Sequence, residues 1–141
     1  EDIRKIYEAR AVIESEIVRR VTPHIPDSVI DRLRDRFTEG YSTLEDREKH
    51  VETDILFHDV LADHVENELF REILDGLNNR ILRVRRFAQL QPEYHLRESH
   101  EEHRQILKAI EARDAERASA LMRCHLKESS KRIRSTFSDH N

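Results

Sequence analysis

The stretch Val51–Leu61, VETDILFHDVL, carries an aspartate and a histidine among apolar residues. Its pattern predicts one helix in which Asp54 and His58 lie four residues apart and therefore share a face. Val51 and Leu61 flank the pair at helical spacing, so this face is the apolar one, which points inward. An unpaired charge buried there would cost several kcal/mol. The Asp and the His must therefore be ion-paired, hydrogen-bonded or bound to a metal.

The composition predicts a single all-α domain over residues 1–141. Hydrophobic residues make up 37% of the chain and charged residues 38%, and there are only 2 Gly and 3 Pro. So few helix-breaking residues, together with the absence of β-branched runs, favour helices joined by short loops over a sheet. The length is sufficient to bury a core without disulfides or a structural metal.

Charge, cysteine content and hydropathy limit the setting in which the chain works. The net charge is −4, and acidic and basic residues are interspersed. A domain that binds nucleic acid by itself would instead carry a basic surface. Cys124 is the single cysteine, so an internal disulfide is excluded, and a reducing, cytoplasmic compartment is expected. No apolar run reaches ~18 residues, so no membrane span is expected. The chain begins EDIRKIYEAR without Met, which is consistent with a fragment of a longer protein.

Apolar periodicity and breakers divide the chain into six predicted helices. They are expected at about residues 2–21, 27–44, 46–63, 68–90, 92–112 and 114–137. Asn67 and Asp114 are the predicted N-caps of the fourth and sixth helices. In the fourth helix, Leu69 and Ile73 are expected to face inward with the rest of its apolar stripe.

Arginines on two of these helices are candidates for binding an anionic effector. Arg10 lies in the apolar stripe of the first helix, with Glu14 at i+4. Either the two form an internal ion pair, or Arg10 extends outward to solvent, or its planar fork faces an anion in the core. The arginines of the fourth helix are expected to form mainly a solvated basic face. Arg83 and Arg86 are the candidates there for turning toward the effector.

Three histidines stand on the apolar stripes of three helices: His58, His103 and His125. The loop between the fifth and sixth helices is short, so these helices are expected to be antiparallel neighbours that bring His103 and His125 to similar heights. With Asp54, the three imidazoles form a candidate site for a divalent transition metal that leaves positions open for a further ligand. Zinc is the first candidate, and nickel or manganese are the alternatives.

A buried polar network without metal is the other interpretation of the same residues. A single histidine on an apolar face is more often satisfied by hydrogen bonds than by a metal. His100 continues the stripe of the fifth helix, either as a fourth imidazole or as an effector-binding neighbour of the ligands. The other histidines are expected at the surface or in loops: His24, His50, His64, His95 and His140.

Known enzymatic motifs fit the sequence poorly. In HEEH at 100–103 the histidines are three residues apart, whereas the zinc-protease motif needs them four apart. No Glu-x-x-His, Gly-rich phosphate loop or nucleophile elbow occurs. We therefore expect no enzyme. The alternative is a metal-dependent hydrolase or lyase on a helical bundle, with Glu14 or His100 as general base.

Three segments of the chain carry a resemblance to a known family. They are IYEARAVIESEIV at 6–18, DILFHDVLADHVENELFREIL at 54–74 and EEHRQILKAIEARDAERASALMRCHL at 101–126. Together they resemble the FCD effector domain, the C-terminal sensor domain of FadR-type regulators in the GntR family of bacterial transcription factors. One departure is Arg113, where the family usually has Gly before the capping Asp.

This resemblance implies an antiparallel bundle of six to seven helices around a central cavity. Asp54, His58, His103 and His125 would hold the metal, a small carboxylate effector would bind beside it, and Arg10 would face that effector. The family's N-terminal winged-helix DNA-binding domain is not present in this chain, so DNA would be bound only through that domain of the full-length protein. The implied function is effector sensing and homodimerisation in a transcription regulator, with the effector modulating DNA binding.

Overall fold

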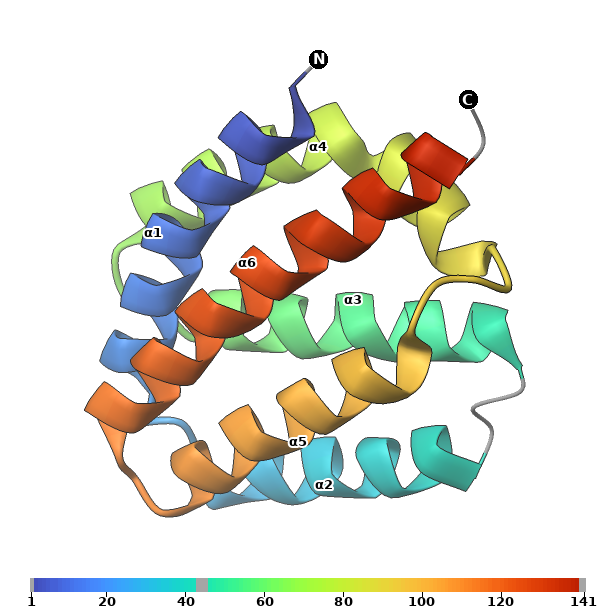
Figure 1. The fold of residues 1–141 in the computed structure, drawn as a ribbon. Helices are drawn as coiled ribbons and strands as arrows, with labels where there is room; N and C mark the ends of the chain where they lie inside the picture. The colour runs from blue at the N-terminus through green and yellow to red at the C-terminus, as the bar shows by residue number, and fades with distance from the viewer. Residues whose placement is uncertain (1, 43–45, 140–141) are drawn as a thin grey trace.

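The computed structural model describes residues 2–42 and 46–139, with the side chains of all of these except 39–42 and 139. Over this range the chain forms six α-helices and no strand (Figure 1). The helices are α1 (Ile3–Val21), α2 (Asp27–Ser42), α3 (Arg47–Asp63), α4 (Glu68–Leu90), α5 (Leu96–Glu111) and α6 (Ala115–Asp139). The prediction of an all-α bundle is therefore confirmed.

Side-chain caps explain where most of the helices begin. The carboxylate of Asp2 accepts from a backbone N–H of the first turn of α1, and Asp46 does the same for α3. The predicted caps Asn67 and Asp114 accept from backbone N–H groups in the first turns of α4 and α6. Each cap satisfies a donor that the helix itself cannot pair.

The fifth helix begins later than predicted, at Leu96 rather than near Pro92. The residues before it form a turn in which the Tyr94 N–H donates to the Gln91 carbonyl. The backbone of His95, directly before the helix, is not helical. Two further predictions, the extension of α2 to Leu44 and the surface position of His140, lie outside the described residues.

Arg113 occupies the left-handed backbone position at the end of α5, with φ of 57°. This is the position at which glycine is favoured, because it has no Cβ to clash. The Arg113 guanidinium donates to the carbonyls of Thr22 and Ile25 and pairs with Asp27. The side chain thus ties the α5–α6 turn to the loop after α1.

Helix α3 lies at the centre of the bundle, where it contacts α1, α2, α4 and α5 (Figure 1). The long helices α1 and α6 pack side by side and cover one side of the bundle. As predicted, α5 and α6 are antiparallel neighbours joined by a short turn. Residues that project inward from α1, α3, α5 and α6 can therefore meet in one place.

One face of α4 is directed outward, against the prediction. Leu69 is 58% exposed and Ile73 is 51% exposed, whereas Leu74, Ile81 and Ala88 are buried. The helix lies at the edge of the bundle and packs on α1, α3 and α6 through its buried side only. Among the described helices, none carries an apolar stretch long enough to cross a membrane.

Candidate metal centre

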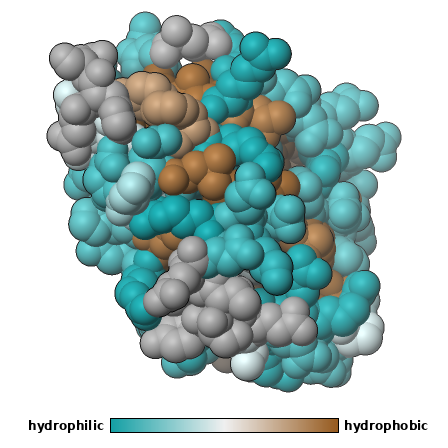
Figure 2. All heavy atoms as spheres, turned by 90° about the vertical axis from the view of Figure 1, so that its right-hand side faces the viewer, coloured by the Kyte–Doolittle hydropathy of each residue, from teal (hydrophilic) through white to brown (hydrophobic). Residues whose placement is uncertain are grey.

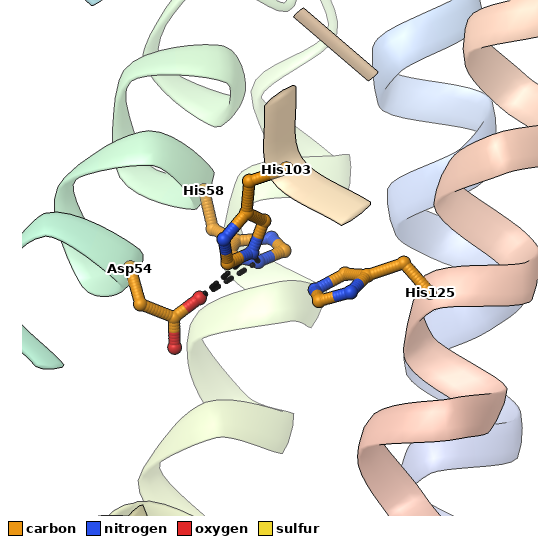
Figure 3. A group of neighbouring side chains, drawn as sticks. All are labelled: Asp54, His58, His103 and His125. Carbon is orange, nitrogen blue, oxygen red and sulfur yellow. Dashed lines mark hydrogen bonds and ion pairs between the residues drawn. The ribbon is translucent and has the colours of Figure 1, made fainter. Parts of the chain in front are cut away.

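Four side chains from three helices converge in the middle of the bundle. Asp54 and His58 project from α3, His103 from α5 and His125 from α6 (Figure 3). Each offers one ligand atom, and these atoms all lie within 4.8 Å of one another. All four side chains are buried. The structure thus brings together the four residues that the sequence analysis selected.

Asp54 uses its two carboxylate oxygens differently. Oδ1 lies 2.9 Å from His103 Nε2 and 3.4 Å from His58 Nε2, so it faces the imidazoles. Oδ2 accepts hydrogen bonds from Arg85 at 2.7 Å and from Gln89 at 2.8 Å. Burial alone would raise the pKa of Asp54, but Arg85 and His103 hold it well below its ordinary value. The carboxylate is therefore charged and fixed in orientation.

The three imidazoles are packed closely against one another. His58 Nε2 and His103 Nε2 are 3.2 Å apart, and the ring centroids of His103 and His125 are 4.3 Å apart. Burial lowers the pKa of His103 and of His125, while Glu14 and Asp54 outweigh burial at His58 and raise its pKa. Histidine binds metal as the neutral imidazole, and burial favours that form at His103 and His125.

This donor set fits a divalent transition metal. Three imidazole nitrogens and one carboxylate oxygen match the preferences of zinc and its neighbours in the first transition row. His103 Nδ1 is buried and has no hydrogen-bond partner among the described residues. A metal at the centre would replace the contacts that the imidazoles now make with one another.

Arg10 and Glu14 form a buried ion pair directly beside the four ligands. The Arg10 Nε donates to Glu14 Oε2 at 2.9 Å, and Arg10 is only 1% exposed. Of the three possibilities for Arg10, the internal pair is thus present and extension into solvent is wrong. Arg10 Nη1 is buried without a hydrogen-bond partner among the described residues.

Other residues predicted to bind the effector lie away from this centre. The side chains of Arg83 and Arg86 are exposed, and the buried arginine of α4 is Arg85. His100 is buried against Phe37 and His50 and is not among the four converging residues.

His50 was expected at the surface, and this prediction is wrong. It belongs to the first turn of α3 and is 2% exposed. His24 and His95 are exposed and His64 is half-buried, as a surface or loop position requires.

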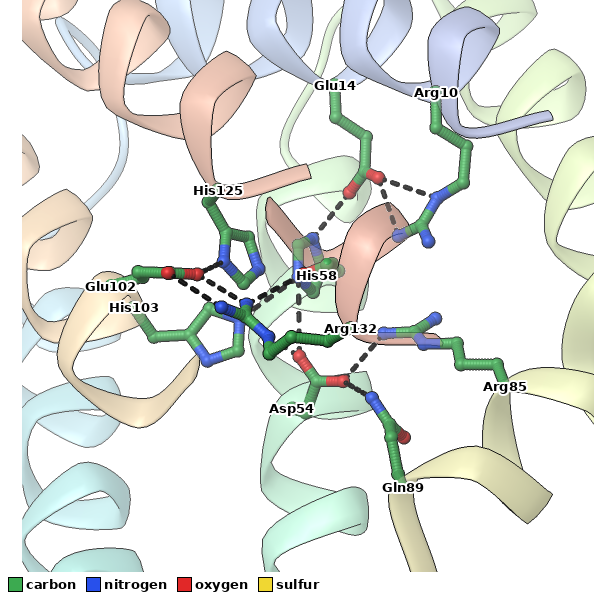
Figure 4. Close-up of polar contacts among 11 residues, drawn as sticks. Arg10, Glu14, Asp54, His58, Arg85, Gln89, Glu102, His103, His125 and Arg132 are labelled. Atoms are coloured by element: carbon green, nitrogen blue, oxygen red, sulfur yellow. Dashed lines mark hydrogen bonds and ion pairs between the residues drawn. The ribbon is translucent and has the colours of Figure 1, made fainter. Parts of the chain in front are cut away.

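Four polar residues that surround the candidate metal centre were not predicted from the sequence: Arg85, Gln89, Glu102 and Arg132 (Figure 4). Helical spacing contained a signal for two of them. Arg85 follows Ile81 by four residues and precedes Ala88 by three, on the buried stripe of α4. Arg132 follows His125 by seven residues, which places both on one face of α6.

Comparison with known proteins identifies the family of this chain. The chain matches the family model of the FCD domain over residues 5–128. The chain belongs to the FCD domain family. This confirms the resemblance recognised in the sequence.

Relatives of this FCD domain include named regulators of transcription. The chain is 25% identical over 130 residues to the HTH-type transcriptional regulator LutR of Bacillus subtilis, covering 89% of this chain and 59% of LutR. It is 28% identical over 125 residues to the HTH-type transcriptional repressor NanR of Citrobacter rodentium, covering 88% of this chain and 48% of that NanR. The NanR of Klebsiella aerogenes is 27% identical over 126 residues, with 89% and 48% coverage. The chain thus spans about half the length of these relatives.

Proposed function

We propose that this FCD domain is the effector-sensing part of a GntR/FadR-type transcription regulator, with a divalent transition metal at Asp54, His58, His103 and His125. The observation that carries the proposal is the buried convergence of these four ligand atoms within 4.8 Å. Zinc is the first candidate, and nickel or manganese are the alternatives. DNA would be bound by another part of the full-length protein, in the cytoplasm where bacterial DNA lies.

A small organic acid is the proposed effector. Its carboxylate would complete the coordination of the metal, because three imidazoles and one carboxylate leave room for a further ligand. Arg10 supports this choice, since its buried Nη1 lacks a described acceptor and a guanidinium suits a carboxylate. The effector would shift the population of helix arrangements by its difference in affinity between them, and so modulate DNA binding.

A hydrolase or lyase would need a general base beside the metal. Glu14 is poorly suited to that role. Burial alone would raise its pKa, but Arg10 and His58 hold it well below the ordinary value, and both its oxygens are engaged. His100 lies against Phe37 and His50 instead. Together with the regulator relatives, this favours sensing over catalysis.

Metal content tests the proposal. We expect the purified chain to bind about one zinc ion, and His58→Ala and His125→Ala to lose it, since each removes one of the coordinating groups. Elemental analysis and calorimetric titration with zinc measure both effects. His50→Ala is the matched control, because His50 is equally buried on α3 but does not join the four ligands. Unchanged zinc content in both ligand variants would refute the site.

We further propose that two copies of the chain pair through the outer face of α4. A single stripe at alternating steps of four and three residues contains Leu69, Ile73, Gly76, Arg80, Arg83 and Phe87. Leu69, Ile73 and Phe87 are large hydrophobic side chains that are about half exposed. Figure 2 shows hydrophobic residues reaching the surface on the side of the molecule where α4 ends. A Cβ at Gly76 would meet nothing within 4 Å, so a second helix has room to approach.

The charges of α4 favour a second copy as the occupant of this face. The first half of the helix exposes Glu68 and Glu72, and the second half exposes Arg83 and Arg86. In an antiparallel pair related by a two-fold axis near Gly76, each acidic half meets the basic half of its partner. The same patch on both copies is therefore complementary to itself.

Light scattering coupled to gel filtration tests the pairing. We expect a dimer, and Ile73→Glu should weaken it by at least ~10-fold because the new carboxylate would be buried without a partner. Val12→Glu is the matched control, since Val12 on α1 and Ile73 are each 51% exposed. A monomeric wild-type chain would refute pairing, and a dimer sensitive only to Val12→Glu would refute the α4 face.

A further inference from the structure

Two of the three imidazoles at the candidate metal centre form hydrogen bonds with glutamate side chains. Glu14 Oε1 lies 2.5 Å from His58 Nδ1, and Glu102 Oε1 lies 2.6 Å from His125 Nδ1. In both cases the contact is made by the ring nitrogen that does not face the other ligands. Figure 4 shows the two carboxylates on the outside of the cluster, each directed at one ring.

Each glutamate contacts a proposed ligand that lies on a different helix from its own. Glu14 on α1 reaches His58 on α3, and Glu102 on α5 reaches His125 on α6. The contacts span 44 and 23 residues of sequence, so each of them joins two different helices. The orientation of each ring is therefore set by the packing of two helices and not by its own helix alone.

An arginine fixes each glutamate in turn. Arg10 donates to Glu14 Oε2, and Arg132 donates to both oxygens of Glu102 at 2.9 and 2.6 Å. Both carboxylates are thus charged acceptors, held in place by charge-assisted hydrogen bonds.

A charged acceptor at Nδ1 decides which tautomer the imidazole adopts. Because a carboxylate can only accept, the ring must carry a proton on Nδ1, which leaves Nε2 as the nitrogen that can bind a metal. In His58, Nε2 is the nitrogen next to Asp54 and His103. Partners of this kind also make the ligating nitrogen more basic, which strengthens metal binding. His103 has no such partner at Nδ1 among the described residues.

We propose that Glu14 and Glu102 are positioning residues of the metal centre, which hold His58 and His125 with Nε2 directed at the metal. This inference rests on the proposed metal site and adds residues that do not touch the metal. It also assigns Arg10 a second role, because Arg10 reaches the metal ligands through Glu14. Occupation of the centre is thereby linked to α1 as well as to α3, α5 and α6.

Zinc affinity measured by competition with a chromophoric chelator tests these roles. We expect Glu14→Gln and Glu102→Gln each to weaken zinc binding by about 10- to 100-fold, the usual cost of removing a hydrogen-bond partner of a metal ligand. Glu101→Gln is the matched control, since Glu101 is the exposed neighbour of Glu102 on α5 and contacts Arg104 and Gln105 instead. Its zinc affinity should equal that of the wild type.

Ring-nitrogen NMR of the metal-free wild-type chain gives a second readout that needs no substitution. His58 and His125 should show a proton on Nδ1, the ring nitrogen next to each glutamate. Protonation on Nε2 alone in both rings would overturn the proposal, as would zinc affinities unchanged in both glutamine variants while the wild type binds zinc. A wild type that binds no zinc at all would instead refute the metal site itself.

Discussion

Two groups of buried histidines lie close together in this bundle and are stabilised in opposite ways. His58, His103 and His125 share their space with Asp54 and are surrounded by charged side chains that form ion pairs. The rings of the neighbouring pair, His50 and His100, have centroids 5.7 Å apart, and His100 packs against the ring of Phe37. Both groups are nearly inaccessible to solvent.

The difference shows that burial alone does not identify a metal site. Around the first group, three arginines are each paired with one carboxylate, in Arg10–Glu14, Arg85–Asp54 and Arg132–Glu102. In the second group the two rings lie against each other, and burial lowers the pKa of both. The first group is therefore stable when each buried charge has its oppositely charged partner, and the second is stable when both imidazoles are neutral.

Breaking one charge pair of the first group should have the largest effect on stability. Arg85→Met removes the main cation beside Asp54 and leaves a buried carboxylate without it, which should lower the free energy of unfolding by ~3–5 kcal/mol. Urea denaturation of the metal-free chain in the presence of a chelator measures this. The expected loss is a large fraction of the stability of a domain of this size.

Arg97→Met provides the control, because Arg97 is an exposed arginine on α5. It should change the free energy of unfolding by no more than ~0.5 kcal/mol. In the double variant Asp54→Leu, Arg85→Met the charge is removed together with its partner, so much of the loss should be recovered. Equal losses in the two arginine variants would mean that Arg85 does not stabilise the centre through its charge.

The convergence of the four residues at the candidate metal centre could be predicted from sequence because two independent regularities select them. Asp54 and His58 are placed on one face by their spacing, and His103 and His125 are brought together by the short turn between their helices. Both regularities depend only on helix geometry. The bundle architecture follows from the same periodicity, with helix boundaries set by side-chain caps.

The residues behind the ligands could not be chosen in this way. Arg83, Arg85 and Arg86 differ by only about 100° per residue around α4, so the orientation of the helix on its neighbours decides which one is buried. The same holds for Glu101 and Glu102, of which only the second faces α6. His50 precedes Asp54 by one helical turn and is covered by α5, where it contacts His100. The sequence pattern of α3 alone does not predict this contact.

Charging the second group should have a smaller effect, which depends on pH. Burial, His50 and Arg104 lower the pKa of His100 to about 4, and Glu101 opposes them only in part. The unfolded chain therefore takes up a proton at His100 near pH 6.5, whereas the folded chain does so only near pH 4. Neutral His100 contributes to the free energy of unfolding above pH 6.5. This contribution, up to ~3 kcal/mol, is lost as the pH falls toward 4.

Unfolding by urea at pH 7.0 and pH 4.5, with a chelator present, measures this loss in the wild type and in His100→Leu. The leucine side chain cannot be protonated, so the difference in unfolding free energy between the two pH values should be smaller in the variant by ~2 kcal/mol. His24→Leu is the control, because His24 is exposed and should leave the difference unchanged. If His100→Leu retained the full pH dependence of the wild type, the neutral state of the His50–His100 pair would not be what stabilises that part of the core.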